Sequence, residues 1–80
     1  MTHTILRLPA ILTSTGLSRS TIYLRIAQGV YTKPVSLGGR AVGWPADEVV
    51  ALNAARIAGK PDTEIRELVT QLEVDRKAVA

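Results

Sequence analysis

The sequence predicts a mainly α-helical fold with four short helices and one small β-hairpin. Three observations indicate it. A Ser-capped helix follows another helix after only three residues, two adjacent glycines separate short apolar segments, and an apolar repeat of helical period lies near the C-terminus. At 80 residues the chain is expected to form a single domain. We divide it into a core with the hairpin, residues 1–60, and a C-terminal helix and tail, residues 61–80.

Residues 15–29, TGLSRSTIYLRIAQG, have the layout of the turn and second helix of a helix-turn-helix. Gly16 can adopt the positive φ that a tight turn between helices needs, and Ser18 can cap the helix that follows. We expect this helix to run from residue 19 to a stop at Gly29. Its first turn is the part that a recognition helix presents to base edges, and it carries Arg19, Ser20 and Thr21.

The helical period assigns the other side chains of this helix to faces. Ile22 and Ile26 share the buried face, and Tyr23 and Arg25 flank it with their polar ends outward, which suits phosphate contacts. For Tyr23, half-buried packing is an equally good interpretation. Leu24 falls on the opposite face, where it could touch a thymine methyl group. The pattern leaves open whether Leu24 or Arg25 faces DNA.

A short helix is expected before the turn. Pro9 suits the first turn of a helix, so this helix is predicted over residues 9–15 with Ile11 and Leu12 inward. The apolar residues 5–8 are expected to form a strand or an extended lead-in.

A hairpin is expected after the second helix. The segment VSLGGRAVGW predicts strands over residues 35–37 and 41–44 around a Gly-Gly-Arg turn. Because two strands are not stable alone, Trp44 is expected to anchor them on the helices. A hairpin in this position is a wing, so the predicted fold is a winged helix-turn-helix. Arg40 at its tip can reach a DNA backbone or minor groove, or it is a solvated turn residue.

Two more helices complete the prediction. The third opens at Pro45, ends by residues 59–61, and carries an irregular apolar stripe formed by Val49, Leu52, Ala55 and Ile57. Asp62 is expected to cap the fourth. Its apolar stripe, which can close the core or pair with a second copy, consists of Ile65, Leu68, Val69 and Leu72. Its outer face is expected to be solvated and carries Glu64, Arg66, Glu67, Gln71 and Glu73. Residues 75–80 are expected to fray.

The basic residues are unevenly distributed. Residues 1–45 contain five Arg or Lys and no Asp or Glu, whereas residues 46–80 contain five basic and seven acidic residues. Chance clustering on a solvated surface can explain such a run. A stretch of this length without a carboxylate nevertheless favours a nucleic-acid partner, because an acidic group there would repel phosphates.

The sequence lacks the residue sets of most active sites. It has no Cys and one His, and the carboxylates of Asp47 and Glu48 suit a helix N-terminus better than acid–base chemistry. Gly38 and Gly39 are not followed by the helix and the Lys-Ser/Thr pair of a phosphate-binding loop. We expect no enzyme activity, cofactor, metal or small-molecule ligand. With no secretory leader or membrane-spanning stretch in the sequence, we expect a cytoplasmic protein.

Several segments together resemble the AlpA family of small phage and prophage regulators, which is related to excisionases and MerR-type regulators. They are LP at 8–9, TGLSRSTIY at 15–23, KPV at 33–35, LGGRAVGW at 37–44 and EV at 48–49. The resemblance covers about residues 5–58. The family pattern differs in having Arg and then an apolar residue after the Tyr, Phe-Pro in place of Tyr31-Thr32, and a Trp near Leu52.

The resemblance implies a winged helix-turn-helix that binds double-stranded DNA as a transcriptional regulator, or bends it as an excisionase-like factor. A terminase small subunit and a protein-interaction module without a DNA role are the alternatives. A homodimer through the C-terminal helix is a further possibility. The residues expected to contact DNA are Arg19, Ser20, Thr21, Tyr23, Arg25, Lys33 and Arg40.

Overall fold

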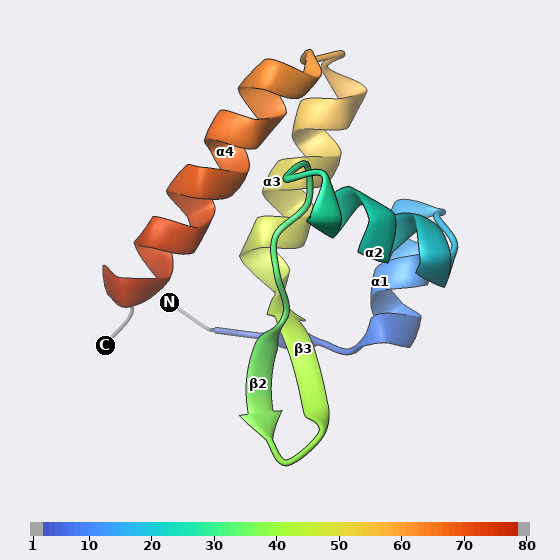
Figure 1. Ribbon diagram of the computed structural model, residues 1–80, viewed down its shortest axis with the longest axis vertical. Helices are drawn as coiled ribbons and strands as arrows, with labels where there is room; N and C mark the ends of the chain where they lie inside the picture. The colour runs from blue at the N-terminus through green and yellow to red at the C-terminus, as the bar shows by residue number, and fades with distance from the viewer. Residues whose placement is uncertain (1–2, 79–80) are drawn as a thin grey trace.

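The computed structural model describes residues 3–78, which form four α-helices and three short strands (Figure 1). In chain order the elements are β1 (Ile5–Leu6), α1 (Leu8–Thr15), α2 (Arg19–Ala27), β2 (Val35–Gly38), β3 (Ala41–Pro45), α3 (Ala46–Ile57) and α4 (Asp62–Asp75). A 3₁₀ turn, η1 (Arg76–Ala78), follows α4 directly. The predicted class, mainly helical with a small hairpin and a winged helix-turn-helix arrangement, is confirmed.

The two strands of the wing, β2 and β3, belong to a three-stranded antiparallel sheet in the order β1-β3-β2, with β3 in the centre. Leu6 of the N-terminal segment pairs with Trp44, and Val35 pairs with Gly43 across the hairpin. Gly43 allows this approach. A Cβ there would collide with Ile5 Cγ2 and lie 3.0 Å from the Leu6 carbonyl oxygen. The sequence left β1 open as a strand or a lead-in, and its pairing with β3 decides for the strand.

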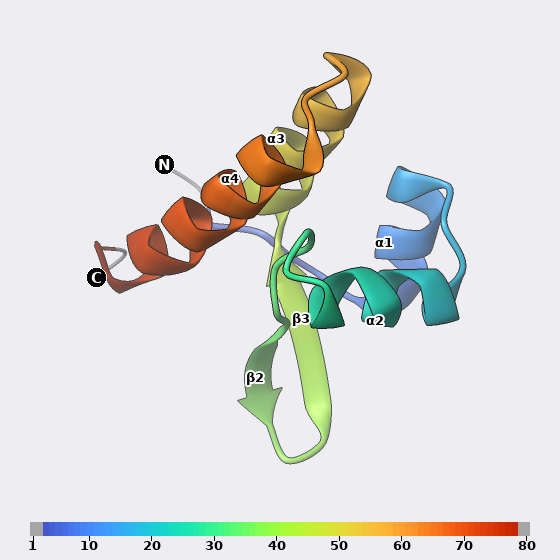
Figure 2. The ribbon, with the colours of Figure 1, turned by 45° about the horizontal axis from the view of Figure 1, so that its top comes forward.

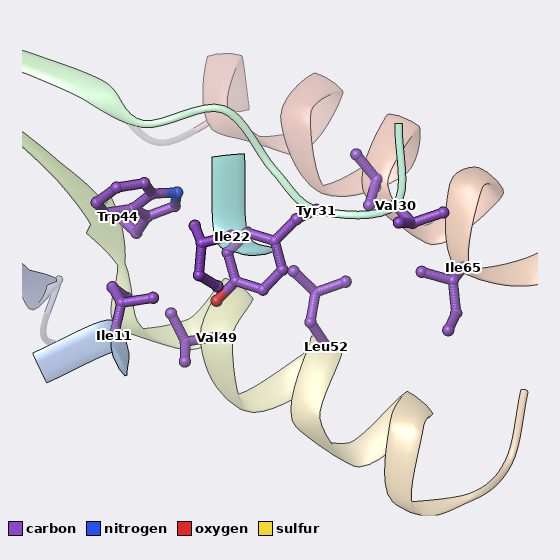
Figure 3. Packing of buried hydrophobic residues seen from close by; sticks show 9 residues of the cluster. Ile11, Ile22, Val30, Tyr31, Trp44, Val49, Leu52 and Ile65 are labelled. Atoms are coloured by element: carbon purple, nitrogen blue, oxygen red, sulfur yellow. The ribbon is translucent and has the colours of Figure 1, made fainter. Parts of the chain in front are cut away.

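The tip of the hairpin projects away from all four helices (Figure 2), while its base is part of the core. Trp44 is fully buried, and its Nε1–H donates to the Thr32 carbonyl oxygen at 3.0 Å. Its ring lies close to Ile11 of α1 and Ile22 of α2, so β3 packs against both helices through this side chain (Figure 3). The predicted anchoring role of Trp44 is therefore confirmed.

Helices α3 and α4 run side by side (Figure 1). The apolar stripe of α4 packs into the same core. Ile65 and Val69 are buried, and Leu68 and Leu72 pack against them. The stripe was expected either to close the core or to pair with a second copy, and in the structure it closes the core. Ile57 is 87% exposed, so its place in the apolar stripe is wrong: it is the last residue of α3, and the helical period turns it away from the buried Leu52.

Two expectations about α4 need correction. Asp62 is its first residue, with Pro61 in the capping position, and its carboxylate pairs with Arg56 at 3.2 Å instead of capping the helix. The prediction of a frayed tail is also wrong for residues 75–78, because Arg76 begins η1 and forms an ion pair with Glu48. Residues 79–80 of that predicted tail lie outside the described residues.

The outer face of α4 is not uniformly solvated. The Arg66 Nε–H donates to the Gln28 carbonyl oxygen at 3.1 Å, and Glu73 Oε2 accepts from the Lys33 backbone N–H at 2.9 Å. The segment of residues 28–34, which joins α2 to the wing, therefore lies against α4. The helical period could not predict this, because the partners are about forty residues away in the sequence.

Candidate nucleic-acid interface

Local hydrogen bonds set the start of α2. Gly16 has a φ of 72°, and its N–H donates to the Leu12 carbonyl oxygen, which ends α1 and turns the chain. Ser18 then accepts a hydrogen bond from the Thr21 backbone N–H at 3.3 Å, as an N-cap does. The predicted turn and cap are both confirmed. The helix ends at Ala27, two residues before the predicted stop at Gly29.

Three hydroxyl groups gather at this N-terminus. Ser18 Oγ lies 2.9 Å from Thr21 Oγ1 and 3.3 Å from Ser20 Oγ. Thr21 is half-buried, whereas Ser20 and Arg19 are exposed. A ligand in front of α2 would therefore meet the Arg19 guanidinium and the Ser20 hydroxyl first.

The N-terminus of α2 is electrostatically suited to an anion. The first turns of α1 and α2 contain no acidic residue, whereas those of α3 and α4 contain two each. The partial positive charge at the end of a helix is thus compensated by carboxylates in α3 and α4 and left uncompensated in α2. Arg19 adds a full positive charge at the same place.

Tyr23 lies between α2 and the wing. Its ring packs edge-to-face on Trp44, with centroids 6.5 Å apart and an interplanar angle of 66°. The Arg19 guanidinium carbon lies 5.8 Å from the centroid of the same ring. Tyr23 is 39% exposed, so it packs on Trp44 with part of its side chain at the surface. The contact between Tyr23 and Trp44 could not be predicted from the sequence, because the two residues lie on different elements.

The structure places Leu24 and Arg25 on different sides of α2. Leu24 is 56% exposed and points outward. Arg25 is half-buried and lines a cavity of about 180 Å³, together with Arg56 and Leu52 of α3. Of these two residues, Leu24 therefore occupies the outward face, and Arg25 lies on the flank toward α3.

Lys33 and Arg40 lie apart from the start of α2. Both backbone polar groups of Lys33 are bonded to the C-terminal part of the chain, its N–H to Glu73 and its carbonyl to Arg76, while its side chain is exposed. Arg40 is exposed in the two-residue turn at the tip of the wing, as predicted. The structure thus groups Arg19, Ser20, Thr21 and Tyr23 at the start of α2, and it leaves Arg25, Lys33 and Arg40 outside this group.

Comparison with known proteins identifies the family. Residues 4–54 match the family model described as Prophage CP4-57 regulatory protein (AlpA). The chain belongs to the AlpA family. The match runs from the start of the sheet through most of α3 and leaves α4 outside it. The description of the family is that of a regulatory protein.

One relative of this AlpA family member is the uncharacterized protein ORF88 of Enterobacteria phage P4. The two are 51% identical over 55 residues, which is 69% of this chain. The match spans 62% of the length of the phage relative. No solved structure matches the chain.

Outside the AlpA match, α4 and η1 are tied to the family core by a buried ion pair. Arg76 donates to both carboxylate oxygens of Glu48 at 2.7 Å and to the Lys33 carbonyl oxygen at 2.6 Å. The hydrogen bond to Glu48 raises the pKa of the Arg76 guanidinium further above its usual value. Burial, and secondly the Glu48 charge, raise the pKa of Tyr31 to about 12.

A larger cavity than the one beside Arg25 lies away from the AlpA helix-turn-helix. It is an open groove of about 560 Å³ near this ion pair, lined by His3, Ile5, Val35 and Leu72 among others. In residues 3–78, no group of three or more His, Cys, Asp or Glu residues is placed to hold a metal ion. No helix there is both long and apolar enough to cross a bilayer.

Proposed function

We propose that this AlpA family member is a transcriptional regulator of the phage or prophage type that binds double-stranded DNA sequence-specifically in the cytoplasm. The observation that carries the proposal is the N-terminus of α2, which is exposed, free of acidic residues in its first turn and occupied by Arg19. Such a helix end attracts phosphates and can place side chains against base edges.

The proposed docking places α2 in a major groove. Arg19 and Ser20 lie near base edges, with Thr21 and the Tyr23 ring beside them. The wing extends along the neighbouring backbone, where Arg40 reaches a phosphate or the minor groove. Lys33 and Arg25 serve as outer phosphate contacts, although Arg25 must extend from its half-buried position to do so.

The test begins with selection of binding sequences from randomised duplexes. Replacing Arg19 by Ala is expected to relax preference at one position and weaken specific binding by about 1–3 kcal/mol. Lys60→Ala is the matched control, since it removes one positive charge from the turn between α3 and α4. If the Arg19→Ala protein keeps the sequence preference of the wild type, Arg19 does not read bases and the proposed docking is wrong at that residue.

Salt dependence separates DNA binding from the alternative of a protein-interaction module. Affinity carried by phosphate contacts must fall steeply with rising salt. A partner whose binding is insensitive to salt, together with no detectable DNA affinity, would refute the proposal and favour the interaction module.

The genomic positions of bound fragments identify the type of DNA-binding protein. Sites in front of promoters support the regulator. Sites clustered at attachment ends indicate an excisionase-like factor, and sites at a packaging origin indicate a terminase small subunit.

Pairing of two copies through α4 would have to use the outward side of this helix, because its apolar stripe is already packed in the core. The exposed Val74 is the large apolar residue available there. Sedimentation of the protein alone and on a DNA duplex measures whether pairing occurs.

A further inference from the structure

We propose that Tyr23 is a positioning residue for base readout: its ring holds the Arg19 guanidinium at the start of α2, and Trp44 holds the ring. This inference rests on the DNA-binding function proposed above. It assigns to the Tyr23 ring a role that differs from a phosphate contact through the hydroxyl.

Trp44 provides a fixed support. It is fully buried, its indole N–H is bonded to the Thr32 carbonyl, and its backbone is paired with Leu6 in the sheet. The edge-to-face contact at 6.5 Å and 66° is a favourable geometry for an aromatic pair. The Tyr23 ring therefore packs against a residue that is held by burial, a hydrogen bond and strand pairing.

The ring in turn restricts Arg19. The two residues are four apart on α2, so their side chains share one side of the helix, and the guanidinium carbon lies 5.8 Å from the ring centroid. Within residues 3–78, no ion pair involves Arg19. The Tyr23 ring is thus the contact that orders this long side chain before DNA arrives, and a side chain ordered in advance loses less entropy on binding.

Three variants separate the ring from the hydroxyl. Tyr23→Phe keeps the ring and removes the hydroxyl. Tyr23→Leu removes the ring, and Tyr23→Met is a second ringless variant whose flexible side chain can fill the space beside Trp44. Since Tyr23 is partly exposed, these changes leave most of the core untouched, and thermal unfolding verifies the fold of each.

The first measurement needs no DNA. In NMR spectra of the free protein, the Arg19 δ-methylene and Nε–H resonances are expected at the same positions in wild type and Tyr23→Phe. They should shift in both ringless variants, because the ring current is lost. Unchanged Arg19 resonances in the ringless variants would overturn the contact itself.

The second measurement uses the duplex selected by the wild-type protein and a duplex changed at the base pair where Arg19→Ala loses preference. Tyr23→Phe should keep the wild-type ratio of affinities. The ringless variants should reduce it about two- to five-fold, the factor that an exposed cation–π contact supplies. When Arg19 is already Ala, Tyr23→Leu and Tyr23→Met should not change the ratio of affinities for the two duplexes any further.

The outcomes distinguish this role from the function on which it rests. If Tyr23→Phe weakens binding to both duplexes equally, Tyr23 is a phosphate contact and the positioning role is refuted. Ringless variants that keep the wild-type ratio refute it too, while DNA binding stands. A wild-type protein that selects no sequence refutes the proposed function and the readout role together.

Discussion

Replacement of Arg76 by Met tests whether the C-terminal helix is held to the family core by its buried ion pair. The Glu48 side chain is only 6% exposed and receives two hydrogen bonds of 2.7 Å from the Arg76 guanidinium. Without Arg76, the carboxylate is left buried and unpaired. Breaking a buried pair in this way typically costs about 3–5 kcal/mol. The Arg76 side chain is 22% exposed, so water can partly replace it, and we expect about 3 kcal/mol.

The opposite change should be milder. In Glu48→Gln the buried acceptor is neutral, and the partly exposed guanidinium can turn toward water, so we expect a loss of about 1–2 kcal/mol. Arg76→Lys is the matched control, because it keeps the charge but cannot form both hydrogen bonds. The double variant Glu48→Met, Arg76→Met removes the unpaired charge and should be more stable than Arg76→Met alone.

Urea unfolding followed by circular dichroism measures each free energy of unfolding. From most to least stable, the expected order is wild type, Glu48→Gln, the double variant and Arg76→Met. A loss below about 1 kcal/mol for Arg76→Met would show that the carboxylate is not desolvated. A double variant less stable than Arg76→Met would contradict the claim that the unpaired buried carboxylate is what destabilises Arg76→Met.

Variants at three further residues have expected outcomes. Gly43→Ala should destabilise the fold by about 1–3 kcal/mol, because the added Cβ collides with β1, and thermal unfolding measures it. The Tyr31 hydroxyl is buried without a hydrogen-bond partner in the described part of the chain, so Tyr31→Phe should cost less than about 1 kcal/mol or stabilise. Because the pKa of Tyr31 is raised from 10.0 to about 12, the unfolded chain loses this proton first, and stability should fall as the pH rises from 10 to 12. Urea titrations at several pH values should show a smaller loss of stability in Tyr31→Phe than in the wild type. An identical loss in the two proteins would contradict the role of Tyr31. Arg40→Ala should weaken binding to all duplexes alike and reduce its salt dependence, and a change in base preference would instead make the wing a reader of bases.

The sequence alone determined the local features of this protein. The turn at Gly16, the cap at Ser18 and the hairpin around Gly38 and Gly39 depend on residues only a few positions apart, so their pattern was enough to predict them. The apolar stripe of α4 was predictable for the same reason. These features also gave the fold class and the candidate residues at the start of α2.

Only the tertiary structure decided how these pieces meet. It placed Tyr23 on Trp44, turned Arg25 toward α3 and left Leu24 outward, and it exposed Ile57. It also bonded α4 and η1 to the segment between α2 and the wing. The partners in these bonds are 38 to 43 residues apart, so no local propensity or period encodes them. These long-range contacts result from packing all the elements around one small core, in which the position of each element depends on the positions of its neighbours.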